Sequence, residues 1–297
     1  MRDIPGYESF TIMEIITKGL SGNEKYRIKT ADGEQLLLRI GDITEYERTK
    51  TEYDMLKIAS ALDIQMSRPV DFGVCDNGKN VYQLLTWVEG VDAESLLPSL
   101  TEAEQFALGI KSGELLKKIH GIPAPEGTED WAARHHRKLQ RWLDEYSSKA
   151  AAHSATGDML VDYLNKNRAL LAACPQTFIH GDFNTENIIC LPNGEVGAID
   201  FNSFNTPYGD PWFDINAVAW TPTMFPAFYS GQIRGYFGGN PPPKFWKVFY
   251  YYLAYDALAA LLDPENFGVS DGKYVVDNVL TWTNSFKNSM PTWFAAL

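Results

Sequence analysis

A short polar motif in the second half of the chain carries side chains that suit phosphate chemistry. Asp182 follows the apolar, β-prone residues 177–179 through Gly181, and Asn187 comes five residues after it. Asp200 follows thirteen residues after Asn187, at the end of another apolar run. Two carboxylates and an amide oxygen are hard oxygen ligands, which suit Mg²⁺ and do not suit zinc. Phosphoryl transfer uses this set, because it needs a base beside the attacking hydroxyl and ligands for ions on the phosphates.

A predicted β-hairpin explains how these three side chains would meet. Residues 187–191 and 195–199 have the pattern of strands, and they flank Pro-Asn-Gly at 192–194, a typical turn sequence. A hairpin returns the start of its first strand and the end of its second to the same edge, so we expect the three groups to converge there. Asp and Asn also favour ordinary solvated turns. Three such residues at this spacing, with strands on both sides, favour the chemical interpretation.

Alternation of apolar and polar residues predicts a β-rich front part of the chain. An Asp-Gly turn at residues 32–33 joins two of the strand-like segments, because Gly tolerates the positive φ of a tight turn. The predicted strands are residues 10–16, 25–30, 36–40, 70–74 and 81–87, and one helix is predicted over residues 45–62.

Helical spacing dominates the rest of the chain. Thr101 and Glu104 form a capping-box sequence, in which each side chain can satisfy the backbone N–H of the other residue. We therefore expect a mostly β lobe over residues 1–88 and a mostly helical lobe over residues 89–297. Further helices are predicted over residues 131–146, 157–173 and most of the chain after residue 214.

Composition excludes several classes of protein. Of the 297 residues, 45% are hydrophobic, too many for a disordered chain. The formal charge of −12 argues against a nucleic-acid partner, which needs a basic surface. The three cysteines form no CxxC pair, so we expect neither a zinc site nor a disulfide framework. No apolar run is long enough for a signal peptide or a membrane span, so we expect a cytoplasmic protein with no membrane partner.

The polar motif also resembles the signature of a known superfamily, and the resemblance covers nearly the whole chain. It implies an α+β, two-lobed fold like that of protein kinases, with a small, mostly antiparallel β N-terminal lobe that holds one main helix, and a larger helical C-terminal lobe. The residues that resemble the signature of the aminoglycoside phosphotransferase and choline kinase superfamily are His180-Gly181-Asp182, Asn187, Ile199-Asp200, Gly209-Asp210-Pro211 and Asp214.

The resemblance implies a role for each matching residue. Asp182 would be the catalytic base that orients and deprotonates the acceptor hydroxyl. Asn187 and Asp200 would hold Mg²⁺ against the phosphates of ATP or GTP. Asp210 and Asp214 would be structural, and would tie the catalytic loop to the segment that follows it.

The resemblance further implies a phosphate-binding loop and a cation in the front lobe. The loop at residues 18–23 lies between the first two predicted strands, where Ser21 and Gly22 would let backbone N–H groups approach a phosphate. On these residues alone, a plain hairpin loop is an equal alternative. Many relatives carry Lys in the third strand, and the matching residue here is Arg39. Arg can pair with phosphate, but its planar fork is not equivalent to the point charge of Lys.

Two further front-lobe sites follow from the resemblance. Glu52 would be the helix acid that pairs with Arg39, with Glu47 as the alternative. The backbone at Thr86 and Val88, in the segment that links the lobes, would meet the purine. These residues also have ordinary interpretations, as solvated helix charges or as packing between the lobes.

The acceptor is the least defined partner. Residues 91–297 carry 15 Lys and Arg against 23 Asp and Glu, and this surplus of 8 acids favours a cationic acceptor. The aromatic segment 245–255 is interpreted as core, with one wall of an acceptor pocket as the alternative. We expect phosphate transfer to a hydroxyl of an aminoglycoside-like or other amine-bearing small molecule. The alternatives are a choline or metabolite kinase and a nucleotide-binding pseudoenzyme that regulates a partner; the oligomeric state stays open.

Overall fold

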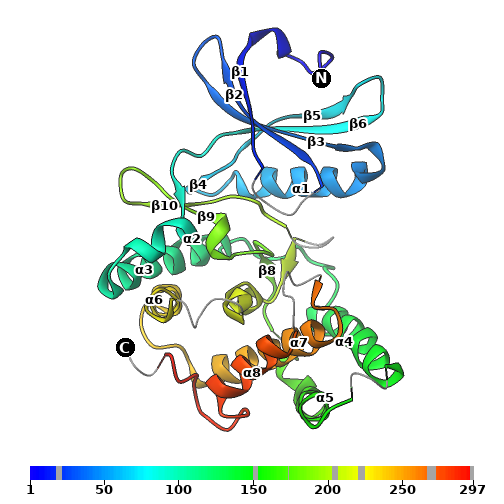
Figure 1. Cartoon of the computed structure of the whole chain (residues 1–297), viewed down its shortest axis with the longest axis vertical. Helices are drawn as coiled ribbons and strands as arrows, with labels where there is room; N and C mark the ends of the chain where they lie inside the picture. The colour runs from blue at the N-terminus through cyan, green and yellow to red at the C-terminus, as the bar shows by residue number, and fades with distance from the viewer. Residues whose placement is uncertain are drawn as a thin grey trace. The chain divides into compact units, whose positions relative to one another are not determined.

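The computed structural model describes residues 1–17, 22–149, 153–172, 174–202, 207–219, 225–265 and 272–294. The chain forms two units (Figure 1). The first comprises Met1–Leu96 and Thr185–Pro207, and the second comprises Leu97–Asn184 and Tyr208–Leu297. The β-hairpin near residue 190 therefore belongs to the same unit as the N-terminal strands. The two lobes expected over residues 1–88 and 89–297, nucleotide-binding and catalytic, stay a prediction.

A five-stranded antiparallel sheet forms most of the first unit (Figure 1). Its strands are, in spatial order, β1 (Phe10–Ile15), β2 (Glu24–Thr30), β3 (Gln35–Asp42), β6 (Asn80–Thr86) and β5 (Pro69–Cys75). Side chains alternate between the two faces of a strand. Leu36, Leu38 and Ile40 of β3 are therefore buried together in the core on one face, and Arg39 points to the other face.

Helix α1 (Tyr46–Ala59) covers the face that carries Arg39. The Tyr53 ring of α1 lies 5.3 Å from the ring of Phe72 in β5, measured between centroids. Gln83 of β6, directly opposite Arg39, donates its amide N–H to the carbonyl oxygen of Thr49 in α1 at 2.8 Å. The Arg39 side chain is therefore held between the sheet and this helix. The strands and the helix predicted for the front part of the chain are confirmed.

A smaller sheet completes the first unit and contains the predicted hairpin. Its strands are, in spatial order, β4 (Gln65–Met66), β10 (Val196–Ala198), β9 (Ile188–Cys190) and β7 (Val91–Asp92). Strands β9 and β10 pair antiparallel, and Gly194 in their turn has a φ of 80°, which favours glycine. The short helices of this unit are η1 (Tyr7–Ser9), η2 (Ile43–Glu45), α2 (Ala93–Leu96) and η6 (Thr185–Asn187).

The second unit is mostly helical. Its α-helices are α3 (Glu102–Ile119), α4 (Trp131–Ser148), α5 (Ala155–Asn167), α6 (Pro226–Phe237), α7 (Pro243–Leu262) and α8 (Gly272–Thr283). The remaining elements are the antiparallel pair β8 (Thr177–Phe178) and β11 (Tyr208–Gly209) and the 3-10 helices η3 (Leu97–Ser99), η5 (Arg168–Leu171) and η7 (Pro211–Ala219). The capping box at Thr101 and Glu104 is present. Within the described ranges, no helix combines the length and apolar character needed to cross a membrane.

The aromatic segment of α7 is core, as the sequence indicated. The side chains of Tyr251 and Tyr252 have no exposed surface. His135 of α4 lies among these rings, 5.4 Å from the Tyr252 centroid and 4.5 Å from that of Tyr255. Burial lowers the pKa of His135 to about 3, because the charged imidazolium would lose its hydration there. These rings thus stabilise the unit by their packing.

Glycines bring α3 and α6 into close backbone contact. A Cβ added to Gly113 would lie 2.0 Å from the carbonyl oxygen of Gln232 and 2.5 Å from the backbone nitrogen of Tyr236. On α6, a Cβ added to Gly231 would lie 2.2 Å from the carbonyl oxygen of Phe106. Neither position has room for a side chain. The spacing of the two helices, and hence the place of Tyr236, depends on these glycines.

We predict that Gly113→Ala destabilises the protein. Ala is the better helix former by about 1 kcal/mol. The added methyl group would overlap the α6 backbone, and overpacking of this kind costs about 1–3 kcal/mol, so we expect a lower Tm in thermal unfolding. The matched control is Glu114→Ala, at an exposed position of the same helix, which should change stability by no more than about 0.5 kcal/mol. An unchanged or higher Tm for Gly113→Ala would contradict the close contact.

Candidate active site

The loop that follows β8 orients Asp182. Gly181 has a φ of 86°, a left-handed conformation that glycine adopts without strain. The backbone N–H of Asp182 donates to Nδ1 of His180 at 3.3 Å. Asn184 donates from Nδ2 to Oδ1 of Asp182 at 3.0 Å. Asp182 is half-buried, and the loop orients its carboxylate through the hydrogen bond from Asn184.

A buried carboxylate, Asp214, anchors this loop. It accepts hydrogen bonds from the backbone N–H of His180 at 2.6 Å and of Gly181 at 2.8 Å. His120, at the end of α3, places Nε2 3.0 Å from the same carboxylate and Nδ1 3.0 Å from the Tyr236 hydroxyl of α6. The Asp214 side chain has no exposed surface, so these partners replace water around its charge. The structural role expected for Asp214 is confirmed.

Asp210 connects the same segment to helices α4 and α7. Its carboxylate accepts from the Tyr252 hydroxyl at 2.7 Å and from the backbone N–H of Trp212 at 3.0 Å. Nε1 of Trp131 donates in turn to the Tyr252 oxygen at 2.8 Å. Burial raises the pKa of Asp210, and the hydrogen bond from Tyr252 acts against that shift. Asp210 is therefore structural too, as expected.

His120 and Tyr236 carry no signal in the sequence that marks them as partners of this loop. Each residue is an isolated polar ring in a segment predicted to be helical, and neither lies at a characteristic distance from His180-Gly181-Asp182 in the sequence. Only the packing of α3 against α6 brings the two residues to Asp214.

Asn187 and Asp200 lie at the open end of the β9–β10 hairpin. The backbone N–H of Ile199 donates to the carbonyl oxygen of Asn187 at 3.0 Å, which closes the hairpin next to Asp200. Asp200 has a φ of 63°, so the chain turns sharply after β10. An amide oxygen and a carboxylate are donor types that Mg²⁺ accepts, with nucleotide phosphates and water as its other ligands. The hairpin therefore brings the two predicted metal ligands together.

The expected convergence of all three residues stays a prediction. Asp182 belongs to the second unit, whereas Asn187 and Asp200 belong to the first. The hairpin geometry explains only why Asn187 and Asp200 lie close together.

Arg39 pairs with Asp200, and not with the helix acid expected from the sequence. Its guanidinium lies 2.8 Å from Oδ1 of Asp200. Glu52 instead pairs with Arg48, one turn earlier on α1, at 3.1 Å. Arg39 and Glu52 are both described, and they form no direct ion pair; the alternative acid, Glu47, is exposed. Burial raises the pKa of Glu52, while Arg48 and Arg39 act against that shift. The role of Glu52 at the nucleotide site stays a prediction.

Ser21 lies outside the described residues, so the predicted phosphate loop is described only from Gly22 onward. Gly22 is exposed, and no described heavy atom lies within 4 Å of the position that a Cβ would take. The phosphate-binding roles of Ser21 and Gly22 stay predictions.

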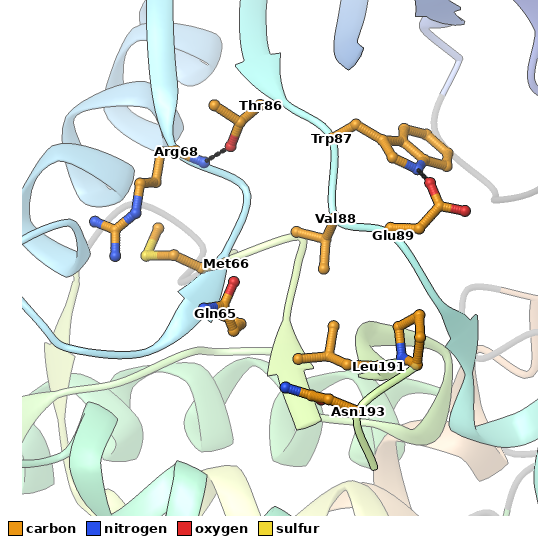
Figure 2. A pocket seen from close by; sticks show the side chains of 10 residues that line it. Gln65, Met66, Arg68, Thr86, Trp87, Val88, Glu89, Leu191 and Asn193 are labelled. Carbon is orange, nitrogen blue, oxygen red and sulfur yellow. Dashed lines mark hydrogen bonds between the residues drawn. The ribbon is translucent and has the colours of Figure 1, made fainter. Parts of the chain in front are cut away.

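A cavity of about 590 Å³ lies beside the linking segment of the first unit (Figure 2). Thr86 and Val88 line it, and Figure 2 shows the Val88 side chain pointing toward Leu191 near the hairpin turn. The Thr86 hydroxyl accepts from the backbone N–H of Arg68 at 2.8 Å. The cavity thus lies at the turn end of the hairpin, opposite the end that carries Asn187. A purine contact by the backbone at Thr86 and Val88 stays a prediction.

The model of the phosphotransferase enzyme family matches residues 14–246 of the chain. The chain belongs to the phosphotransferase enzyme family. The match spans most of the chain, including four strands of the large sheet (β2, β3, β5 and β6), the Asp182 loop, the hairpin and the Asp214 anchor. The predicted enzyme class, a kinase that transfers phosphate, is confirmed. The comparison with curated proteins gives no match for this member of the family.

Solved structures confirm the predicted kinase-like α+β fold. A thermostable mutant of aminoglycoside phosphotransferase APH(4)-Ia, in its apo form, is 16% identical over 92% of this chain and 95% of that one, with a TM-score of 0.63. A ternary complex of streptomycin, ATP and APH(2'')-IIa is 16% identical over 88% and 90%, with a TM-score of 0.63. A choline/ethanolamine kinase family protein from Mesorhizobium loti is 17% identical over 99% and 94%, with a TM-score of 0.63.

We predict that Asp214→Asn weakens both the fold and the phosphotransferase activity. The two oxygens of Asp214 each accept from one backbone N–H group of the loop. An asparagine side chain has one oxygen and one NH₂ group, so at least one of these buried N–H groups would lose its acceptor. Breaking a buried charged network costs about 3–5 kcal/mol, so chemical denaturation should show a clearly lower free energy of unfolding. Asp162→Asn is the matched control, because its exposed ion pair with Lys166 contributes at most about 1 kcal/mol. Wild-type stability and turnover in Asp214→Asn would contradict the anchoring role.

Proposed function

We propose that this phosphotransferase moves the γ-phosphate of ATP or GTP to a hydroxyl of an aminoglycoside-like or other amine-bearing small molecule. Asp182 is the base, and Asn187 and Asp200 hold Mg²⁺. One observation carries the proposal: an anchored loop orients a half-buried carboxylate, Asp182, in a member of the phosphotransferase enzyme family.

Asp182 acts on the acceptor hydroxyl. Its carboxylate, oriented by Asn184, accepts a hydrogen bond from that hydroxyl and positions the oxygen for attack on the γ-phosphorus. The new O–P bond forms while the bond from the γ-phosphorus to the β–γ bridging oxygen breaks. The hydroxyl proton passes to the Asp182 carboxylate. The products are the phosphorylated acceptor and a nucleoside diphosphate.

The hairpin residues serve the phosphates. Bound Mg²⁺ supplies positive charge to the phosphate oxygens, and Asn187 and Asp200 offer it an amide oxygen and a carboxylate. Arg39, 2.8 Å from Asp200, fixes the direction of that carboxylate and adds a permanent positive charge nearby. The structural neighbour solved with streptomycin and ATP supports a nucleotide donor for this fold.

The acceptor class follows from charge more than from aromatic rings. Residues 91–297 carry 23 acidic against 15 basic side chains, which favours a cationic acceptor. The rings of Tyr251 and Tyr252 are buried in the core and offer no face to a bound amine. The acidic side chains of this lobe are therefore the groups that we expect to recognise an amine. This favours an amine-rich acceptor over a quaternary one that needs an aromatic cage.

To test the proposed function, phosphate transfer would be followed by mass spectrometry across a panel of hydroxylated amines that includes streptomycin, gentamicin, choline and ethanolamine. We expect wild type to phosphorylate at least one of them. Asp182→Asn should lower kcat by about 10²–10⁴-fold, because general base catalysis contributes that much. Equal turnover by both proteins would contradict the role of Asp182. Nucleotide binding by wild type without transfer to any acceptor would favour the pseudoenzyme.

A further inference from the structure

Two cations lie side by side on the α1 face of the large sheet. Lys25 of β2 is directly opposite Arg39 of β3 in the antiparallel register. Residues paired in this way project from the same face, with Cβ atoms about 5 Å apart. The ammonium of Lys25 and the guanidinium of Arg39 therefore share one region near Asp200.

Lys25 is the unneutralised member of this pair. Its side chain is half-buried, and it makes no ion pair with any residue that the structure describes. Burial and the neighbouring Arg39 lower the pKa of Lys25, while Asp200 and Glu186 act in the opposite direction. Asp200 itself is already engaged by Arg39 at 2.8 Å.

This arrangement is unfavourable for the protein alone. Like charges directly opposite each other destabilise an antiparallel pair of strands, and a partly desolvated ammonium loses hydration that no ion pair with a described residue replaces. An apolar residue at the position of Lys25 would remove both costs. Unfavourable choices of this kind occur at functional sites, where a ligand supplies the missing partner. Lys25 and Arg39, next to the carboxylate that we propose as a metal ligand, would be neutralised by a ligand with several negative charges.

We propose that Lys25 is a second phosphate-binding cation, which acts together with Arg39 on the polyphosphate chain of the nucleotide. The proposal rests on the proposed function of the site. Arg39 keeps one edge of its guanidinium on Asp200, and Lys25 provides the compact, mobile point charge that a planar guanidinium does not. The strand pair thus supplies two cations, one from β2 and one from β3.

The test compares the affinity for ATP with that for adenosine, by calorimetry and by competition, in the presence of Mg²⁺. Lys25→Met keeps the apolar stem and removes the charge; we expect it to weaken ATP binding about 10- to 100-fold, as for a lost charge-assisted hydrogen bond, and to leave adenosine binding unchanged. Lys25→Arg should restore much of the ATP affinity. Lys29→Met is the matched control, since it removes the same charge from an exposed position on the same strand, and both affinities should stay within about threefold of wild type.

Thermal unfolding gives an independent readout. Without nucleotide, Lys25→Met should have a higher Tm than wild type, because the repulsion from Arg39 is gone, and ATP should raise its Tm by less. A lower Tm together with equal losses of ATP and adenosine affinity would assign Lys25 a structural role and overturn the proposal. ATP binding that Lys25→Met retains in full would overturn this proposal alone. Absence of ATP binding by wild type would overturn the proposed function and this inference with it.

Discussion

The loop that carries Asp182 depends on a buried carboxylate. The Asp214 carboxylate has no exposed surface; it accepts hydrogen bonds from two backbone N–H groups of the loop and lies within hydrogen-bond distance of the His120 ring. Removing a carboxylate from water costs several kcal/mol unless such partners are in place. The loop conformation and the position of His120 are therefore energetically coupled. His120 in turn is held by Tyr236, whose helix reaches α3 only because glycines face each other there.

In the first unit, residues of the proposed nucleotide site lower the stability of the fold. The sheet places Arg39 and Lys25 together on a face that α1 partly covers, where each cation would be better hydrated in solvent. Asp200 takes a left-handed backbone conformation that is unfavourable for a residue with a side chain, and its carboxylate engages Arg39. These features stabilise little by themselves. They place an amide oxygen, a carboxylate and positive charge at the open end of the hairpin, where the Mg²⁺-nucleotide that we propose would use them.

Much of the fold was predictable because its determinants are local. Alternation located the strands, the Asp-Gly and Pro-Asn-Gly sequences located the turns, and the capping box located the start of α3. The hairpin that brings Asn187 and Asp200 together was predictable for the same reason.

What the sequence left open depends on contacts between distant segments. The partner of Arg39 is Asp200, and no local pattern shows that Glu52 is already engaged by Arg48. His120 carries no signal of its own, because its partners come from α6 and from the residues around position 214. Lys25 looks like an ordinary strand charge until the register places it opposite Arg39. Such residues become visible only when the strand pairing and helix packing are known.

The central claim is that Asp182 acts on the acceptor, whereas Asn187 and Asp200 act on the metal and its nucleotide. The Mg²⁺ dependence of the affinity for a non-hydrolysable ATP analogue, measured by calorimetry on wild type, Asp182→Asn and Asp200→Asn, separates these roles most directly. We predict that Asp182→Asn binds the analogue as wild type does, with the same enhancement by Mg²⁺. In Asp200→Asn that enhancement should be lost. Full Mg²⁺ enhancement in Asp200→Asn, or its loss in Asp182→Asn, would contradict the account.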